Sequence, residues 1–128
     1  MELHLLSDGF FTLDKSLVVY MKYMGQPYDA ALKPMLILTP EDKILVDTGI
    51  GELPERYRKF WTIKRGAEEN LKTQLTKHNL KPEDIDVVIN THLHFDHCGN
   101  NAIFRNAKFF VQEDELRYAH APDKFQQA

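Results

Sequence analysis

The sequence predicts an α+β domain in which helices cover one face of a β-sheet. Two patterns lead to this prediction: the first half of the chain holds short strand-like segments, and the second half alternates helical and strand-like segments. The third observation is size, because 128 residues are enough for one domain and too few for two. We therefore expect a single domain over residues 1–128.

Turn signals separate the strands expected in the first half. Residues 2–6 alternate weakly between polar and apolar, and residues 17–23 are rich in β-branched and aromatic side chains. Residues 35–39 and 43–46 are apolar runs on either side of a short polar turn, which is typical of a hairpin. The stretch 49–66 has no clean periodicity, so we expect a long loop with a turn or two of helix.

The second half follows the order helix, strand, loop, helix, strand, helix. Leu71 and Leu75 lie four residues apart, as on one face of a helix, and the last helix opens with acidic residues, as the helix dipole prefers. The expected elements are a helix from residue 67, a helical turn over 82–84, strands over 85–89 and 108–111, and a helix over 113–120.

Composition excludes several classes of protein. Hydrophobic residues make up 43% of the chain and charged residues 27%, which is ordinary for a globular domain with a core. The net charge is −3 and no basic stripe is present, so we expect no nucleic-acid partner. No apolar run approaches the roughly 20 residues that span a bilayer, so we expect no membrane partner. The lone Cys98 allows no intramolecular disulfide, and the N-terminus does not resemble a secretory signal; both favour a cytoplasmic location.

The segment that indicates chemistry runs from Thr91 to Gly99 and reads Thr-His-Leu-His-Phe-Asp-His-Cys-Gly. In an extended chain His92, His94 and Asp96 share one face, and Leu93 and Phe95 lie on the other, where they can anchor the loop in the core. A helix beginning near Asp96 would turn His97 in a neighbouring direction. Histidines also cluster by chance, cap helices or lie on polar loops, but this spacing after an apolar strand favours metal binding.

Two pairs of ligands would then diverge from one loop: His92 with His94, and Asp96 with His97. Such pairs suit two metal ions a few ångströms apart. Imidazole and carboxylate donors suit zinc, iron, manganese or cobalt better than calcium or magnesium. Two histidines cannot fill a coordination shell, so further ligands must come from elsewhere in space.

Asp47 is a weaker candidate, at the end of the strand over residues 43–46. It is either a turn aspartate that bonds nearby backbone N–H groups or a carboxylate that orients a ligating histidine, and the sequence favours neither. Cys98 is expected to be a small buried residue rather than a reactive thiol.

The segment His92-Leu-His-Phe-Asp-His97 resembles the His-X-His-X-Asp-His signature of the metallo-β-lactamase superfamily. Residues 43–49 resemble the early strand of this family that ends in Asp-X-Gly, and residues 80–92 resemble its approach to the motif. Residues 99–115, with Leu93 and Phe95, are most similar to the N-acyl-homoserine lactonase branch.

The resemblance implies an αββα sandwich in which His92 and His94 bind a first metal and Asp96 and His97 a second. Zinc is expected, two ions per complete site, with Asp47 in a supporting role. The implied reaction is the attack of a hydroxide, held between the two metals, on a lactone or other ester carbonyl. Asp96 would also act catalytically by passing a proton to the leaving alkoxide.

Complete members of the family are roughly twice as long, and their C-terminal half supplies a third histidine, a bridging aspartate and a last histidine. This chain therefore resembles the N-terminal ββα half of the sandwich, apparently truncated. Its exposed sheet face would then be apolar and would favour a homo-oligomer.

Several alternatives stay open for the function. The chain could be an inactive or incomplete metal-binding or assembly fragment, or part of a glyoxalase II-like thioester hydrolase. A nuclease is disfavoured by the absence of a basic surface. A flavodiiron-like redox site usually carries glutamate at the position of His94, which argues against it.

Overall fold

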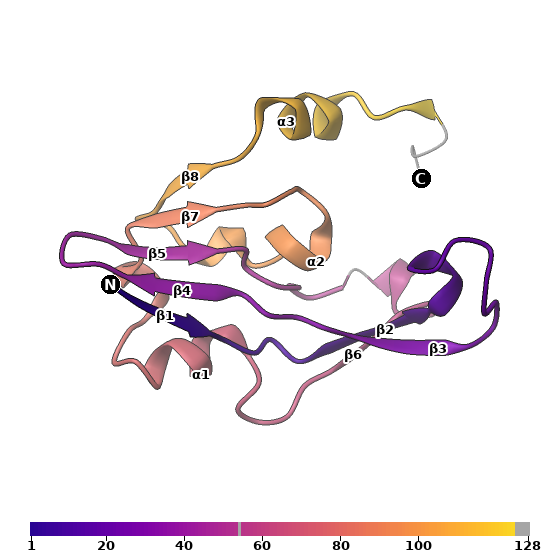
Figure 1. The fold of residues 1–128 in the computed structure, drawn as a ribbon, viewed down its shortest axis with the longest axis horizontal. Helices are drawn as coiled ribbons and strands as arrows, with labels where there is room; N and C mark the ends of the chain where they lie inside the picture. The colour runs from indigo at the N-terminus through magenta and orange to yellow at the C-terminus, as the bar shows by residue number, and fades with distance from the viewer. Residues whose placement is uncertain (54, 125–128) are drawn as a thin grey trace.

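The strands form two sheets that lie one after the other along the long axis of the molecule (Figure 1). The computed structural model describes residues 1–53 and 55–124. The five-stranded sheet has the order β1 (Glu2–Leu5), β4 (Met35–Leu38), β5 (Lys43–Val46), β7 (Val87–Ile89) and β8 (Lys108–Phe110). The three-stranded sheet has the order β3 (Pro27–Ala31), β2 (Phe10–Asp14) and β6 (Thr62–Lys64).

Within residues 1–53 and 55–124, three α-helices and four short 3-10 helices accompany these strands. The α-helices are α1 (Leu71–Thr76), α2 (Phe95–Cys98) and α3 (Glu113–His120). The 3-10 helices are η1 (Lys15–Leu17), η2 (Glu55–Tyr57), η3 (Pro82–Asp84) and η4 (Asn101–Ile103). No helix within residues 1–53 and 55–124 is long and apolar enough to cross a membrane.

The larger sheet mixes antiparallel and parallel pairing. The predicted hairpin of β4 and β5 is confirmed: the strands are antiparallel, and Thr39 N donates to the Asp42 carbonyl across the turn at 3.0 Å. Strands β5, β7 and β8 are parallel. Because parallel strands end at the same edge of a sheet, the residues that follow β5 and β7 meet there. That edge carries Asp47 and the histidine segment.

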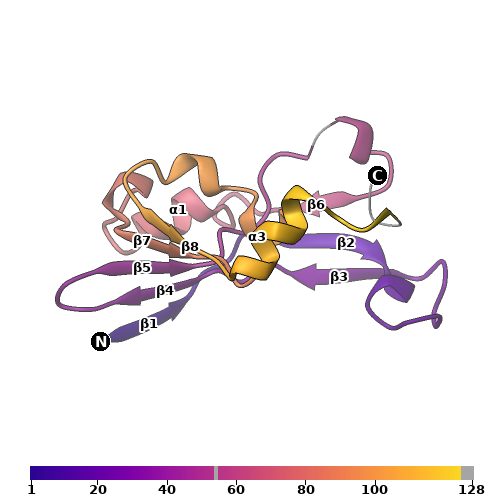
Figure 2. The same ribbon diagram turned by 90° about the horizontal axis from the view of Figure 1, so that it is seen from above.

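Helix α1 covers one face of this sheet, as the sequence predicts (Figure 2). Leu71 and Leu75 of α1 are fully buried with Leu36, Leu45 and Val88 of the central strands. Asn70 caps the helix by accepting a hydrogen bond from Thr73 N at 2.9 Å, so the helix begins later than residue 67. Burial of this apolar surface is the main stabilising contribution to this half of the molecule.

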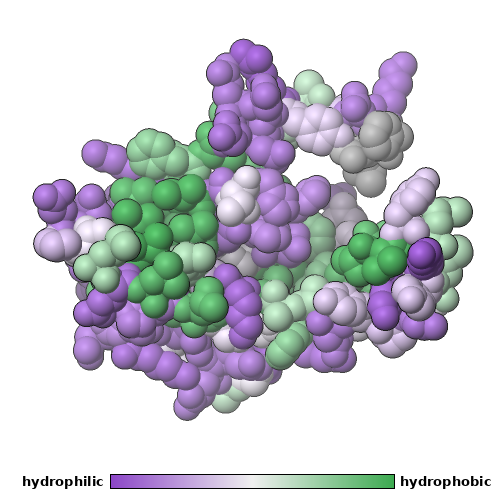
Figure 3. All heavy atoms as spheres, viewed as in Figure 1, coloured by the Kyte–Doolittle hydropathy of each residue, from purple (hydrophilic) through white to green (hydrophobic). Residues whose placement is uncertain are grey.

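The opposite face of the same sheet is apolar and open to solvent. Side chains alternate along each strand, so the neighbours of the buried leucines point away from α1. Figure 3 shows hydrophobic side chains gathered over this face. We call it the open sheet face; two cross-strand rows form it, Leu5, Met35, Val46, Ile89 and Phe110, and Leu3, Ile37, Ile44 and Val87.

The second sheet is where the sequence prediction fails. The strand expected over residues 17–23 is wrong: η1 and turns occupy this segment, and strands β2, β3 and β6 were not predicted. Asp14 explains the difference, because its carboxylate accepts hydrogen bonds from Ser16 N at 2.8 Å and Gly25 N at 2.6 Å and folds the chain into a long hairpin end. The β-branched and aromatic residues of this end are mostly exposed, so no packing favours a strand there.

Candidate metal centre

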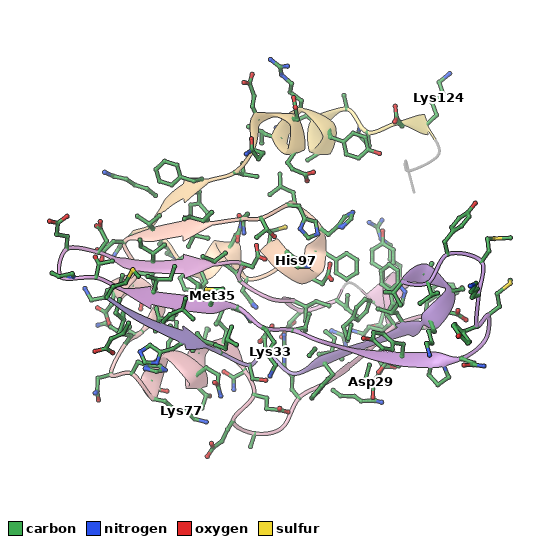
Figure 4. The ribbon with its side chains drawn as sticks, viewed as in Figure 1. Asp29, Lys33, Met35, Lys77, His97 and Lys124 are labelled. Carbon is green, nitrogen blue, oxygen red and sulfur yellow. The ribbon has the colours of Figure 1, made fainter. Side chains whose placement is uncertain are left out.

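The histidine segment leaves β7 in an extended conformation and then turns into α2. His94 is the N-cap residue, with a ψ of 146°, and its carbonyl accepts hydrogen bonds from His97 N and Cys98 N. The helix expected near Asp96 begins one residue earlier, at Phe95. This turn brings three imidazoles together: the ring centroids of His92 and His97 are 4.0 Å apart, and those of His92 and His94 are 4.8 Å apart. Figure 4 shows His97 near the junction of the two sheets.

Asp47 binds this segment from the end of the neighbouring strand. Its carboxylate accepts hydrogen bonds from Thr91 N and Thr91 Oγ1, each at 2.8 Å, and lies 2.8 Å from Nδ1 of His97. These partners lie more than forty positions away from Asp47 in the sequence, so the contacts are not those of a turn aspartate, which bonds its immediate neighbours. Asp47 has a φ of 58°, a left-handed conformation that non-glycine residues adopt mainly at constrained sites.

The Asp47 contact determines the form of His97. A carboxylate only accepts hydrogen bonds, so Nδ1 of His97 carries a proton, and in the neutral ring Nε2 keeps its lone pair. Nε2 lies 3.6 Å from Oδ2 of Asp96. The structure therefore places Nε2 of His97 beside the carboxylate of Asp96, whereas Asp47 contacts the other ring nitrogen, Nδ1.

Thr91 has a similar effect on His92. Its hydroxyl donates to Asp47, so the same oxygen accepts from Nδ1 of His92 at 3.1 Å and leaves Nε2 free. Burial and the neighbouring His97 and His94 lower the pKa of His92, which favours the neutral ring. The sequence predicts no role for Thr91, and its position directly before the first histidine is the one signal that could indicate it.

Backbone contacts hold the loop after β5 against α2. Thr48 N donates to the His97 carbonyl at 2.7 Å, and Gly99 N donates to the Gly49 carbonyl at 3.0 Å. A Cβ atom on Gly99 would lie 2.3 Å from the backbone nitrogen of Gly51, so this approach requires glycine. Cys98 is half-buried rather than buried, and burial raises the pKa of its thiol.

The donors suit a metal ion but do not complete a shell. Within residues 1–53 and 55–124, no three His, Cys, Asp or Glu side chains are arranged around one point that could hold an ion. The donor types nevertheless fit: two imidazoles have a free Nε2, and a carboxylate backs one of them, as is usual for metal-bound histidines. Together, these residues can supply ligands to a metal whose other ligands come from elsewhere.

An apolar pocket of about 270 Å³ lies beside the centre. Phe95 and Trp61 stack there at 4.9 Å, and Trp61 stacks on Tyr57 at 5.2 Å. Ile50 and Leu53 complete the apolar part of the wall. Phe95 also packs edge-on against Phe11 of the smaller core cluster, with ring centroids 5.5 Å apart, so it anchors the loop there rather than in the main core and stays partly exposed.

Comparison with known proteins gives a consistent result. The family model of the metallo-beta-lactamase superfamily matches residues 34–126. The chain is 30% identical to the N-acyl homoserine lactonase of Bacillus cereus over 133 aligned positions, which cover 97% of this chain and 53% of that protein. It is 47% identical to a probable metallo-hydrolase of Methanocaldococcus jannaschii over 57 residues, 44% of this chain and 28% of that protein.

Solved structures agree in fold. An N-acyl homoserine lactone hydrolase with N-hexanoyl-L-homoserine bound at its catalytic metal centre superposes with a TM-score of 0.80 at 28% identity. This match covers 94% of the present chain and 52% of that one. A probable metal-dependent hydrolase from Staphylococcus aureus gives a TM-score of 0.78 at 30% identity, covering 95% and 50%. The chain thus spans about half the length of the Bacillus cereus lactonase and of these two solved structures.

Proposed function

Since the chain belongs to the metallo-beta-lactamase superfamily, we propose that it forms the N-terminal, metal-binding half of a hydrolase that opens lactones or related esters. The observation that carries this proposal is the bond between Asp47 and Nδ1 of His97, which leaves the ring ready to bind a metal. A histidine on a polar surface loop would not need such a partner.

In this proposal His92 and His94 bind one ion, and Asp96 and His97 bind a second. Zinc suits these donors best, with two ions per complete site; iron, manganese or cobalt also suit them. When bound, zinc lowers the pKa of water toward neutrality and polarises a carbonyl oxygen. The remaining ligands come from outside the described residues.

The side chains of this chain then have distinct tasks. Asp47 holds His97 and, through Thr91, His92, so that both rings keep one orientation and one tautomer. Asp96 relays a proton during ester cleavage: it accepts the proton that the attacking water gives up, and it delivers that proton to the leaving oxygen as the bond between the acyl carbon and this oxygen breaks. We therefore assign it a catalytic role in addition to metal binding.

The apolar pocket supports a substrate with a hydrophobic part. Its aromatic wall, formed by Tyr57, Trp61 and Phe95, adjoins the histidine segment through Phe95 itself. An acyl chain attached to a lactone ring has this character. Together with the lactonase relatives, the pocket leads us to propose an N-acyl homoserine lactone as substrate, with a thioester of the glyoxalase II type as the alternative.

A second candidate function is that of an assembly module. The open sheet face and the incomplete ligand set both favour association with another polypeptide, and a second copy of this chain is the simplest partner. We also propose a cytoplasmic setting, because the lone Cys98 forms no intramolecular disulfide.

The test combines metal content with turnover. Zinc per chain is measured after purification, and hydrolysis of N-hexanoyl homoserine lactone and of a thioester is followed by chromatography. His94→Gln should lose zinc, whereas the matched control His120→Gln, in exposed α3, should keep it. A wild-type chain that binds no zinc under any condition contradicts the proposal. Zinc binding without turnover is the result expected of an isolated half of the site, whereas a zinc-free oligomer without turnover favours the assembly module.

A further inference from the structure

A buried ion pair lies beneath the metal centre, in the link between the two sheets. Asp8 lies between β1 and β2 and is only 1% exposed, and its Oδ2 atom lies 2.7 Å from Nη2 of Arg65. The side chain of Arg65 is 26% exposed. A buried carboxylate is costly unless it is paired and hydrogen-bonded, and burial does raise the pKa of Asp8. A carboxylate buried at such a cost needs partners that stabilise its charge.

The carboxylate of Asp8 bonds both the loop that follows β5 and the first residue of α1. Its Oδ2 accepts a hydrogen bond from Ile50 N at 2.9 Å, and Oδ1 accepts one from Leu71 N at 3.2 Å. Arg65 Nη2 donates to the Ile50 carbonyl, so the ion pair holds both polar backbone groups of Ile50. The pair therefore clamps one residue of this loop from the interior of the molecule.

The fit between Asp8 and the loop is close. Gly49 has a φ of 68°, and a Cβ atom there would lie 2.4 Å from Oδ2 of Asp8. Asn100 adds a further connection, because its Nδ2 donates to the Thr48 carbonyl at 2.7 Å and lies 3.4 Å from Oδ2 of Asp8. Little freedom remains for the loop on its interior side.

The clamped loop begins with the residue that holds the histidines. Asp47 lies three positions before Ile50, and its carboxylate bonds Thr91 and His97. Thr48, between them, bonds the His97 carbonyl. The loop is thus held on one side by Asp8 and Arg65 and on the other by the histidine segment, and only two residues separate Ile50 from Asp47.

From this geometry we propose that Asp8, paired with Arg65, is a positioning residue of the metal centre. It acts through Ile50 and the loop to place the Asp47 carboxylate behind His97. The inference rests on the proposed function in so far as His97 binds a metal, but the positioning itself is a property of the metal-free protein. Asp8 touches no proposed ligand, and it contacts the wall of the apolar pocket only through the backbone N–H of Ile50.

The test uses Asp8→Asn, which keeps the shape of the side chain and removes its charge. Two quantities are measured on folded protein: the NMR signal of the His97 Nδ1 proton without metal, and the zinc dissociation constant by competition with a chromophoric chelator. We expect the proton signal to weaken through faster exchange with water, and zinc to bind about tenfold more weakly, at the lower end of the range for residues that support metal ligands.

Asp14→Asn is the matched control. Asp14 also accepts two backbone N–H bonds, from Ser16 and Gly25, but at the far end of β2. We expect it to lower thermal stability while leaving the His97 signal and zinc affinity unchanged. If Asp8 only stabilised the fold, Asp8→Asn would behave in the same way, and that result would overturn the inference.

Two further arms keep the outcome decisive. If Asp8→Asn does not fold, Arg65→Lys replaces it: lysine keeps the charge but cannot hold Asp8 and Ile50 with the same fork, so we expect weaker zinc binding than in the wild type. Unchanged zinc affinity and an unchanged His97 signal in Arg65→Lys would then overturn the inference. If the wild-type chain binds no zinc, the proposed function fails, whereas the His97 proton signal still decides whether Asp8 positions Asp47.

Discussion

Replacement of Asp47 by asparagine tests the centre of the proposed site directly. Asp47 presents two acceptor oxygens to three donors: Thr91 N, Thr91 Oγ1 and Nδ1 of His97, each at 2.8 Å. Asparagine has one acceptor oxygen and one donor nitrogen of the same shape. In either orientation of the amide, at least one N–H or O–H group now faces another donor.

The expected loss follows from which contact fails. If the amide nitrogen faces His97, the ring relieves the clash by moving its proton to Nε2, which can then no longer bind a metal. Loss of a carboxylate behind a metal-bound histidine typically weakens metal binding by about 10- to 100-fold. That factor corresponds to about 1.4 to 2.8 kcal/mol of binding free energy.

The assay is a zinc competition titration at constant pH, with thermal unfolding measured on the same samples. Asp86→Asn is the control, because Asp86 also accepts a backbone N–H, from Lys43 at 2.8 Å, but lies at the opposite end of the strands. We expect Asp86→Asn to keep wild-type zinc affinity. Equal zinc affinity in Asp47→Asn and the wild type would refute the proposed role of Asp47.

Three further predictions concern stability and association. Leu45→Ala, at a fully buried position, should lower the free energy of unfolding by about 2–5 kcal/mol in urea titrations. Burial and the nearby His4 lower the pKa of His78 below its usual 6.5, so the unfolded chain binds more protons, and stability falls as pH drops through 6.5. His78→Asn should reduce this loss, measured as the difference in Tm between pH 7.5 and pH 5.5. Met35→Lys, on the open sheet face, should shift self-association toward monomer in sedimentation velocity, and a wild type that is already monomeric would contradict that interface.

The larger sheet could be predicted because its signals are local. Residues 35–38 and 43–46 are contiguous apolar runs around a polar turn, and the strand 87–89 lies inside the predicted 85–89. The smaller sheet depends on contacts between distant segments: Phe11 pairs with Ala30 and with Ile63, and no short window of sequence contains both partners. A three-residue strand such as β6 becomes recognisable only when its neighbour is in place.

The site divides along the same line. The four proposed ligands lie within one hexapeptide, so their spacing alone indicates metal chemistry. The sequence alone cannot decide whether Asp47 is a turn aspartate or a carboxylate that orients a histidine. Its bond to His97 forms only because the parallel strands β5 and β7 end at the same edge of the sheet. The role of Asp8 is harder still to predict from sequence. Its local sequence indicates only a turn, and its bonds to Ile50 and Arg65 form only when both sheets have packed together. A local motif thus supplies the metal-ligand candidates, and nonlocal contacts orient them. The ligand candidates are therefore easier to predict from sequence than the residues that orient them.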